Sequence, residues 1–166
     1  MTRWKEKTNL GLSTVMLLLA LTGAATVAQD IKSTADIAVV VNAKNPETNI
    51  SKATLRKILL GEQHSWSNKT GIDLVLREPG NSARDAVLGG VVGMNDKEYK
   101  DYWFAKVYRG EVASEPLSVP SDGLASEYVS SNSGAIAFMP GTDVRKDAKV
   151  LKVDGLLPGT PGYALK

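Results

Sequence analysis

The stretch GIDLVLREPGNSARDAVL, Gly71–Leu88, contains a strand signal, a turn and a helix start in direct succession. Leucines and a valine follow a turn glycine, which is typical of a β-strand over Gly71–Glu78. The Pro-Gly pair turns the chain, and Asn81 or Ser82 is placed to cap the helix that follows. A strand that runs through a short turn into a helix is typical of α/β proteins, so this stretch predicts an α/β sheet.

The rest of the chain continues this alternation of strand and helix signals. Further strands are predicted at 36–42, 134–139 and 148–155, and further helices after the cap residues Ser51, Asn95 and Ser121. The predicted order, β-α-β-α-α-α-β-β, indicates one α/β domain with a mixed sheet flanked by helices. Ligands of such sheets bind beyond the carboxyl ends of the strands, next to helix starts. The turn-rich tail 156–166 is expected to lie extended on the surface.

Charge and composition narrow the class of partner. The chain of 166 residues has 20 basic and 18 acidic residues, and these balance once residues 1–28 are set aside. A neutral domain gives no reason to expect nucleic acid as a partner. The chain has no Cys, which excludes disulfides and thiolate metal sites, and its single His and scattered carboxylates have no metal-site spacing. We therefore expect no metal and no cofactor.

Residues 1–28 have the pattern of a secretory signal peptide. A basic start precedes the apolar run Leu10–Leu21, and small residues near Ala28 suit cleavage after that residue. The alternative is an uncleaved membrane anchor, because Leu10–Ala28 approaches the roughly 20 residues that cross a bilayer. The prediction is a signal peptide over 1–28 and a periplasmic or secreted domain over 29–166.

The helix start after the Pro-Gly turn is the strongest candidate site for an anion. The first N–H groups of a helix are free and positively polarised, and Asn81 and Ser82 add side-chain donors. Arg84 lies in the first turn, where the helix dipole disfavours a cation unless an anion accompanies it, and Arg77 ends the strand nearby. The alternative is that Arg84 pairs with a neighbouring carboxylate, Asp85 or Glu78, and that nothing binds.

Other chemistry has weaker support. The segment GNSAR lacks the final Gly of a nucleophile elbow, and the single His, His64, lies in a polar loop, so no catalytic residue is predicted. Gly89, Gly90 and Gly93 match no phosphate-binding loop, and close helix packing is expected to explain them. The aromatic residues of segment 99–108 lie at helical spacing, which favours packing in the core over stacking on a ligand.

Several motifs together resemble the periplasmic phosphate-binding proteins of ABC transporters. IAVVVNAKNPETNISKATLRKILLGEQHSW (37–66) is similar to the family's strand, Asn-Pro turn and helix. REPGNSARDAVLGGVVGM (77–94) is similar to its anion-binding loop and helix, and SNSGAIAFMP (131–140) to its return strand. The resemblance covers 37–139 and implies one lobe of a type II periplasmic binding protein, in which an ion is held between two lobes. The family's first lobe has no counterpart in the predicted domain.

For function, the resemblance implies that phosphate or a similar oxyanion binds at Asn81, Ser82 and Arg84, with Arg77 close by. The chain departs from the family here, because Asn81-Ser82-Ala83 stands in place of Ser-Gly-Thr. Two functions stay open. The first is an oxyanion-binding domain linked to ABC-type phosphate uptake, as a single lobe or as a homodimer. The second is a periplasmic interaction module that has lost the ligand and contacts a membrane transporter or envelope protein.

Overall fold

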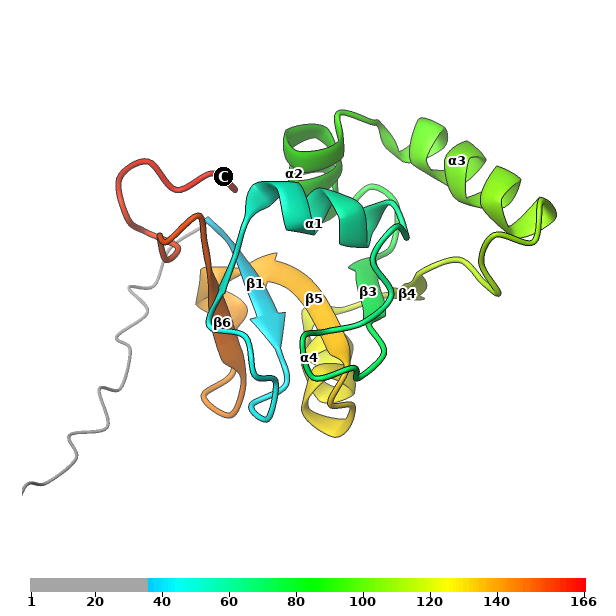
Figure 1. Cartoon of the computed structure of the whole chain (residues 1–166). Coiled ribbons are helices and arrows are strands. Elements are labelled where there is room, and N and C mark those ends of the chain that lie inside the picture. The colour runs from blue at the N-terminus through cyan, green and yellow to red at the C-terminus, as the bar shows by residue number, and fades with distance from the viewer. Residues whose placement is uncertain (1–35) are drawn as a thin grey trace, which may run out of the picture.

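Figure 1 shows the computed structural model, which describes residues 36–166. The described chain forms a six-stranded sheet in the order β2-β6-β1-β5-β3-β4, with helices on both faces. This confirms the predicted α/β class. The strands are β1 (Ile37–Val41), β2 (Asn49–Ile50), β3 (Asp73–Arg77), β4 (Leu117–Val119), β5 (Ala135–Pro140) and β6 (Lys149–Val153). The predicted signal peptide lies outside the described residues.

The sheet is mixed, as predicted, because one central strand runs against the others. β1 is antiparallel to both of its neighbours, with Val39 opposite Phe138 of β5 and Leu151 of β6. β2 is parallel to β6, and β3 is parallel to both β4 and β5. The carboxyl ends of all strands except β1 therefore lie at one edge of the sheet, which we call the carboxyl edge. The first residue of β1 lies there too, since Ile37 is opposite Pro140.

The helices begin at side-chain caps that the sequence indicates. Ser51, Asn95 and Ser121 each accept a hydrogen bond from a backbone N–H of the following turn, and Asn95 forms a complete capping box with Glu98. Of the two candidates for the remaining cap, it is Asn81 that accepts these bonds. The helices are α1 (Lys52–Leu59), α2 (Ser82–Val87), the π-helical turn η1 (Leu88–Val92), α3 (Asp96–Tyr108), α4 (Asp122–Ser131) and the 3-10 turn η2 (Gly141–Asp143).

Alternate residues of β1 supply the two layers of the core. Ile37, Val39 and Val41 pack with the α1, α2 and α3 side, and Ala38 and Val40 pack with the α4 side. All five side chains are buried, which is why this strand is a continuous apolar run rather than an alternating one. None of the helices within 36–166 has the length and apolar character needed to span a bilayer.

The C-terminal tail contradicts its predicted place on the surface. Tyr163 and Leu165 are 3% and 1% exposed, and both belong to the main core. The Tyr163 hydroxyl donates to the Ile37 carbonyl at 2.8 Å, and the Ile37 N–H donates to the Leu165 carbonyl at 3.0 Å. Because this segment is rich in turn residues, its composition does not predict the burial of Tyr163 and Leu165. The tail closes the core beside the start of β1.

The expectation that Gly89, Gly90 and Gly93 serve close helix packing is also wrong. A Cβ added at any of them would meet no atom within 4 Å. Gly93 instead ends η1 with a φ of +77°, a conformation that glycine adopts without strain.

Helix α3 stands out from the sheet and is fixed chiefly through one of its faces (Figure 1). Side chains on that face donate hydrogen bonds to carbonyl groups at the end of α1: Tyr99, Tyr102, Trp103 and Lys106 donate to Leu59 or Leu60. Gly61 follows α1 with a φ of +60°, and a Cβ there would lie 2.6 Å from Cη2 of Trp103. We call this set of contacts the α1–α3 clamp.

The prediction that the aromatic residues of α3 pack in the core is only partly confirmed. Tyr99 and Trp103 are buried, in agreement with it. Phe104 and Tyr108 are 65% and 84% exposed, so for these two the prediction is wrong. The clamp explains the difference, because it turns the opposite face of α3 away from the molecule.

Candidate functional site

The carboxyl edge carries two helix starts, that of α2 on one face of the sheet and that of α4 on the other. β3 and β4 run parallel, with Arg77 opposite Val119 at their ends. The chain then enters α2 through its cap Asn81 and α4 through its cap Ser121. Both helices therefore present their positively polarised N-termini near the end of β3, the position at which an anion is favoured.

Arg77 is held by the start of α4. Its Nη1 lies 2.6 Å from Oδ2 of Asp122, and its Nη2 donates to the Pro120 carbonyl at 2.7 Å. Two atoms of this pair, Nε of Arg77 and Oδ1 of Asp122, are buried and have no hydrogen-bond partner among the described residues. An unused donor and an unused acceptor are therefore left at the edge, and buried polar atoms of this kind normally have partners.

Arg84 is held in the opposite direction, by the start of α3. Its Nε donates to Oδ1 of Asp96, and its Nη1 donates to the Arg77 carbonyl at 2.8 Å. Its guanidinium carbon lies 5.7 Å from the centre of the Tyr99 ring. The carboxylate that accompanies this cation is Asp96 and not Asp85 or Glu78, the two candidates close to it in sequence.

The pKa of Asp96 reflects this environment. Burial raises the pKa of the carboxyl, but the hydrogen bonds from Arg84 and from the Gly80 N–H outweigh burial and bring the pKa below its ordinary value. Asp96 is therefore charged at neutral pH and offsets the cation placed in the first turn of α2.

The cap of α2 leaves few free donors. Oδ1 of Asn81 accepts from the N–H groups of Ala83 and Arg84 at 3.0 and 3.3 Å. The Asn81 amide nitrogen and the exposed Ser82 hydroxyl have no partner within residues 36–166. These two groups are the side-chain donors available to a ligand at this helix start.

The predicted site residues thus lie close together along the backbone, but the side chains of Arg77 and Arg84 point in different directions. The Arg84 guanidinium contacts the Arg77 main chain, whereas the Arg77 side chain turns to α4 and that of Arg84 turns to α3. The two aspartates that hold them were not predicted as site residues. The available signal was an Asp directly after a capping Ser or Asn, in Ser121-Asp122 and Asn95-Asp96.

Arg84 also lines a cavity of about 430 Å³ between β3, β4 and α3. Leu76, Tyr99 and Trp103 give this cavity apolar walls. The charged groups around it are of both signs: Arg84, Lys97 and Lys100 against Asp96 and Glu115. Neither Asn81 nor Ser82 contributes to its lining, so this cavity is distinct from the helix start of α2.

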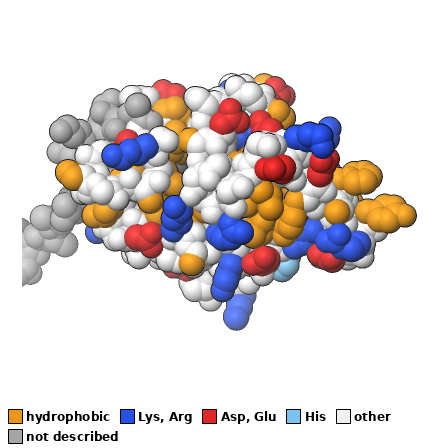
Figure 2. Space-filling model, turned by 90° about the horizontal axis from the view of Figure 1, so that it is seen from above, with side chains coloured by type: hydrophobic (Ala, Val, Ile, Leu, Met, Phe, Trp, Pro, Cys, Tyr) orange, Lys and Arg blue, Asp and Glu red, His pale blue; other side chains and the backbone are white. Residues whose placement is uncertain are grey.

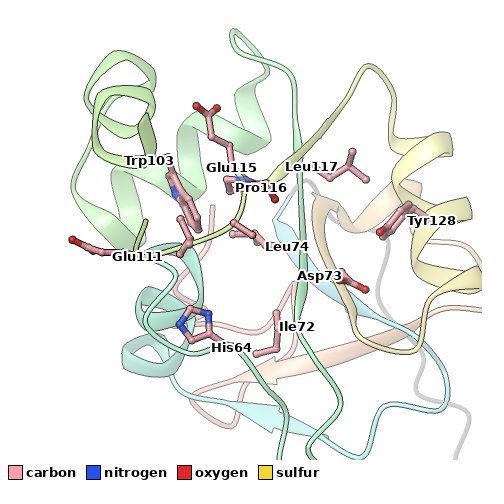
Figure 3. A pocket seen from close by; sticks show the side chains of 13 residues that line it. His64, Ile72, Asp73, Leu74, Trp103, Glu111, Glu115, Pro116, Leu117 and Tyr128 are labelled. Atoms are coloured by element: carbon pink, nitrogen blue, oxygen red, sulfur yellow. The ribbon is translucent and has the colours of Figure 1, made fainter. Parts of the chain in front are cut away.

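A second cavity, of about 550 Å³, is shown in Figure 3. Ile72, Leu74 and Trp103 belong to its apolar lining. Its acidic residues are Asp73, Glu111 and Glu115, His64 lies beside them, and no Lys or Arg lines it. In Figure 3 the carboxylates of Glu111 and Glu115 point away from Leu74. Such a lining disfavours an anion, and no group of His, Asp and Glu among the described residues is arranged to hold a metal ion.

Comparison with solved structures finds proteins of similar fold. A candidate phosphate ABC transporter substrate-binding protein from Clostridium perfringens, solved with bound phosphate, matches with a TM-score of 0.59 and 24% identity over 73% of this chain. An ABC-type phosphate transport receptor from Vibrio cholerae matches with 0.60 and 24% over 74%. PstS from Borrelia burgdorferi matches with 0.61 and 17% over 78%.

The match covers only part of each of these proteins. The chain spans 46%, 48% and 53% of their lengths, which corresponds to the single lobe that the sequence predicts. No curated protein matches the chain. The sequence model of one family, described as the PBP superfamily domain, matches residues 25–158. The chain belongs to this family of PBP superfamily domains.

Proposed function

We propose that this chain is a periplasmic solute-binding domain that holds phosphate or a similar oxyanion at the carboxyl edge, in the service of ABC-type phosphate uptake. The family and the fold support a solute-binding role. The helix starts of α2 and α4, with Arg77 between them, support an anionic ligand at that edge. The cavity of Figure 3 is a poorer choice, because its charged residues are acidic.

The pair of unused atoms at Arg77 and Asp122 carries this proposal. Nε of Arg77 is a donor without an acceptor, and Oδ1 of Asp122 is an acceptor without a donor, within the described chain. Both atoms are closed to solvent in the described chain, so an oxyanion reaches them only when the Arg77–Asp122 pair opens. Hydrogen phosphate then supplies both complements, since a P–O⁻ oxygen accepts and the P–OH group donates. Sulfate has no proton at neutral pH and would face the Asp122 carboxylate with a bare oxygen.

The same aspartates limit the expected affinity. Arg77 and Arg84 each already hold a carboxylate, so the local charge at this edge is close to neutral. A divalent anion that leaves water needs many donors, and this lobe offers few. We therefore expect a single lobe to bind the oxyanion only weakly.

Titration calorimetry with phosphate and with sulfate tests this proposal. We expect phosphate to bind at least about tenfold more tightly than sulfate, a difference of about 1.4 kcal/mol. Asp122→Asn should abolish that preference, because an amide can donate to sulfate. Asp101→Asn, which alters an exposed ion pair with Lys97 on α3, is the matched control and should leave it unchanged. Absence of heat with both anions up to tens of millimolar would refute the proposal.

A second candidate function, an interaction module without a ligand, is favoured by the structural role of Arg84. This side chain is only 9% exposed and is held by Asp96, the Arg77 carbonyl and the Tyr99 ring, which is a structural role. A module of this kind would capture the same envelope protein with or without phosphate. Pull-down with the Asn81→Ala/Ser82→Ala variant separates the two functions, since an interaction module retains its partner and an empty eluate counts against it.

A further inference from the structure

The cavity between β3, β4 and α3 is a second place at which a small molecule fits. Its volume of about 430 Å³ lies within the range of ligand pockets. Its apolar walls come from separate elements: Leu76 from β3, Tyr99 and Trp103 from α3, and Pro116 from the segment before β4. Leu76, Tyr99 and Trp103 also belong to the main core, so these walls are held in place without a ligand.

Arg84 brings one unused donor to this cavity. Its Nε donates to Asp96 and its Nη1 donates to the Arg77 carbonyl. Its Nη2 has no hydrogen bond within residues 36–166, and it is not among the unpartnered atoms that are closed to solvent. The side chain is only 9% exposed and lines the cavity, so Nη2 is a fixed donor that a ligand there can reach.

Lys100 supplies a free positive charge to the same lining. Lys100 and Trp103 stand at i and i+3 on α3, so they are neighbours on the helix surface. Lys100 has no ion-pair partner among residues 36–166, whereas the other lysine of the lining, Lys97, is paired with Asp101. A cation therefore stands beside an aromatic wall with no anion to neutralise it.

The two acidic residues of the lining do not cancel this charge. Both carboxylate oxygens of Asp96 are already used, one by Arg84 and one by the Gly80 N–H. Glu115 is exposed and lines the cavity of Figure 3 as well, so it lies on the rim between the two cavities. An acidic residue on the rim opposes a second negative charge on a ligand, so a single negative charge is the best match.

The surrounding surface leaves the choice of ligand to this lining. Figure 2 shows side chains of both charges beside hydrophobic ones at the right-hand end, where Figure 1 places α3. Such a mixed surface does not attract a highly charged partner. The walls favour an apolar body, and Lys100 with Nη2 of Arg84 favours one carboxylate. We propose that this cavity binds a small carboxylic acid with an aromatic or aliphatic body, independently of the oxyanion site.

Two-dimensional NMR titration with phenylpropionate and its uncharged amide, phenylpropionamide, tests the place and the charge. We expect the acid to shift the backbone amide signals of Leu76, Tyr99 and Ser118 with a Kd of about 1 mM or tighter, and the amide to bind at least about tenfold more weakly. Phosphate should not displace the acid, so this result stands apart from the oxyanion site. Equal binding of acid and amide, tighter binding of phenethylamine, displacement by phosphate, or shifts confined to other residues would overturn the proposal.

Variants of the lining test the residues. Lys100→Gln should raise the Kd of phenylpropionate at least about fivefold, and Lys100→Arg should keep it near the wild-type value. Ser118 is exposed and pairs with Leu76 in the sheet, so Ser118→Trp should fill the cavity and abolish binding. Lys146→Gln, at an exposed lysine outside the lining, is the control. Equal Kd values for Lys100→Gln and Lys146→Gln, or a folded Ser118→Trp variant that still binds the acid, would contradict the proposal.

Discussion

At the scale of single residues, the two arginines of the candidate site show how a charge is fixed before any ligand arrives. Each was expected from its position: Arg77 at a strand end and Arg84 in a first helical turn. Their partners, Asp122 and Asp96, are distant along the chain, so no local pattern reveals which pairs form. The sequence therefore predicts the cations of the site but not the aspartates that hold them.

Asp96 makes stability depend on pH. Its pKa is below its ordinary value in the folded chain, so the stabilisation is present at neutral pH and is lost as pH falls through the folded pKa. We expect Asp96→Asn to lower the free energy of unfolding by about 2 kcal/mol at pH 7 and by less at pH 3. Urea denaturation at both pH values measures it; an equal loss at both would contradict the ion-pair account.

Substitutions at Gly61 and Gly93 distinguish the cost of backbone strain from the cost of a steric clash. Both have positive φ, but only at Gly61 would a Cβ meet a neighbour, Trp103. We expect Gly93→Ala to cost about 1 kcal/mol and Gly61→Ala at least about 2 kcal/mol more, since Trp103 must move. Chemical denaturation of the two variants side by side checks the difference, and similar costs would show that Trp103 yields freely.

At the scale of elements, the sequence predicts those whose signal is local. The helix caps at Ser51, Asn95 and Ser121 and the apolar run of β1 are complete within a few residues, and the structure confirms them. β2 and β4 were not predicted, because these short edge strands exist only through pairing with distant partners. The sequence does not predict the exposure of Phe104 either, since this exposure depends on which face of α3 packs against the end of α1.

The α1–α3 clamp is expected to control the mobility of α3. Lys106 is buried and donates to the Leu60 carbonyl at 3.0 Å, so it closes the C-terminal end of α1 with a positive charge. We expect Lys106→Met to cost about 1–2 kcal/mol and to speed hydrogen exchange within α3 more than within the sheet. Lys100→Met, at an exposed position of the same helix, is the control. Equal hydrogen-exchange rates in both variants would show that Lys106 does not control the mobility of α3.

At the scale of the whole molecule, the C-terminal tail belongs to the core. Burying one large apolar side chain contributes about 1.5–3 kcal/mol, and the tail buries Tyr163 and Leu165. Removal of residues 160–166 should therefore destabilise the domain by about 4 kcal/mol, and Tyr163→Phe by only about 1 kcal/mol through the lost bond to Ile37. Thermal denaturation tests both, and an unchanged Tm after truncation would refute this role.

The hydrogen bond between the Ile37 N–H and the Leu165 carbonyl has a consequence for protein engineering. The first strand and the last residues meet at the carboxyl edge, so a short linker could join them without disturbing the sheet. New termini opened in the exposed segment 145–147 would give a circular permutant with the same fold. A fluorophore placed on that linker would sit at the edge proposed to receive the oxyanion and would report its arrival directly.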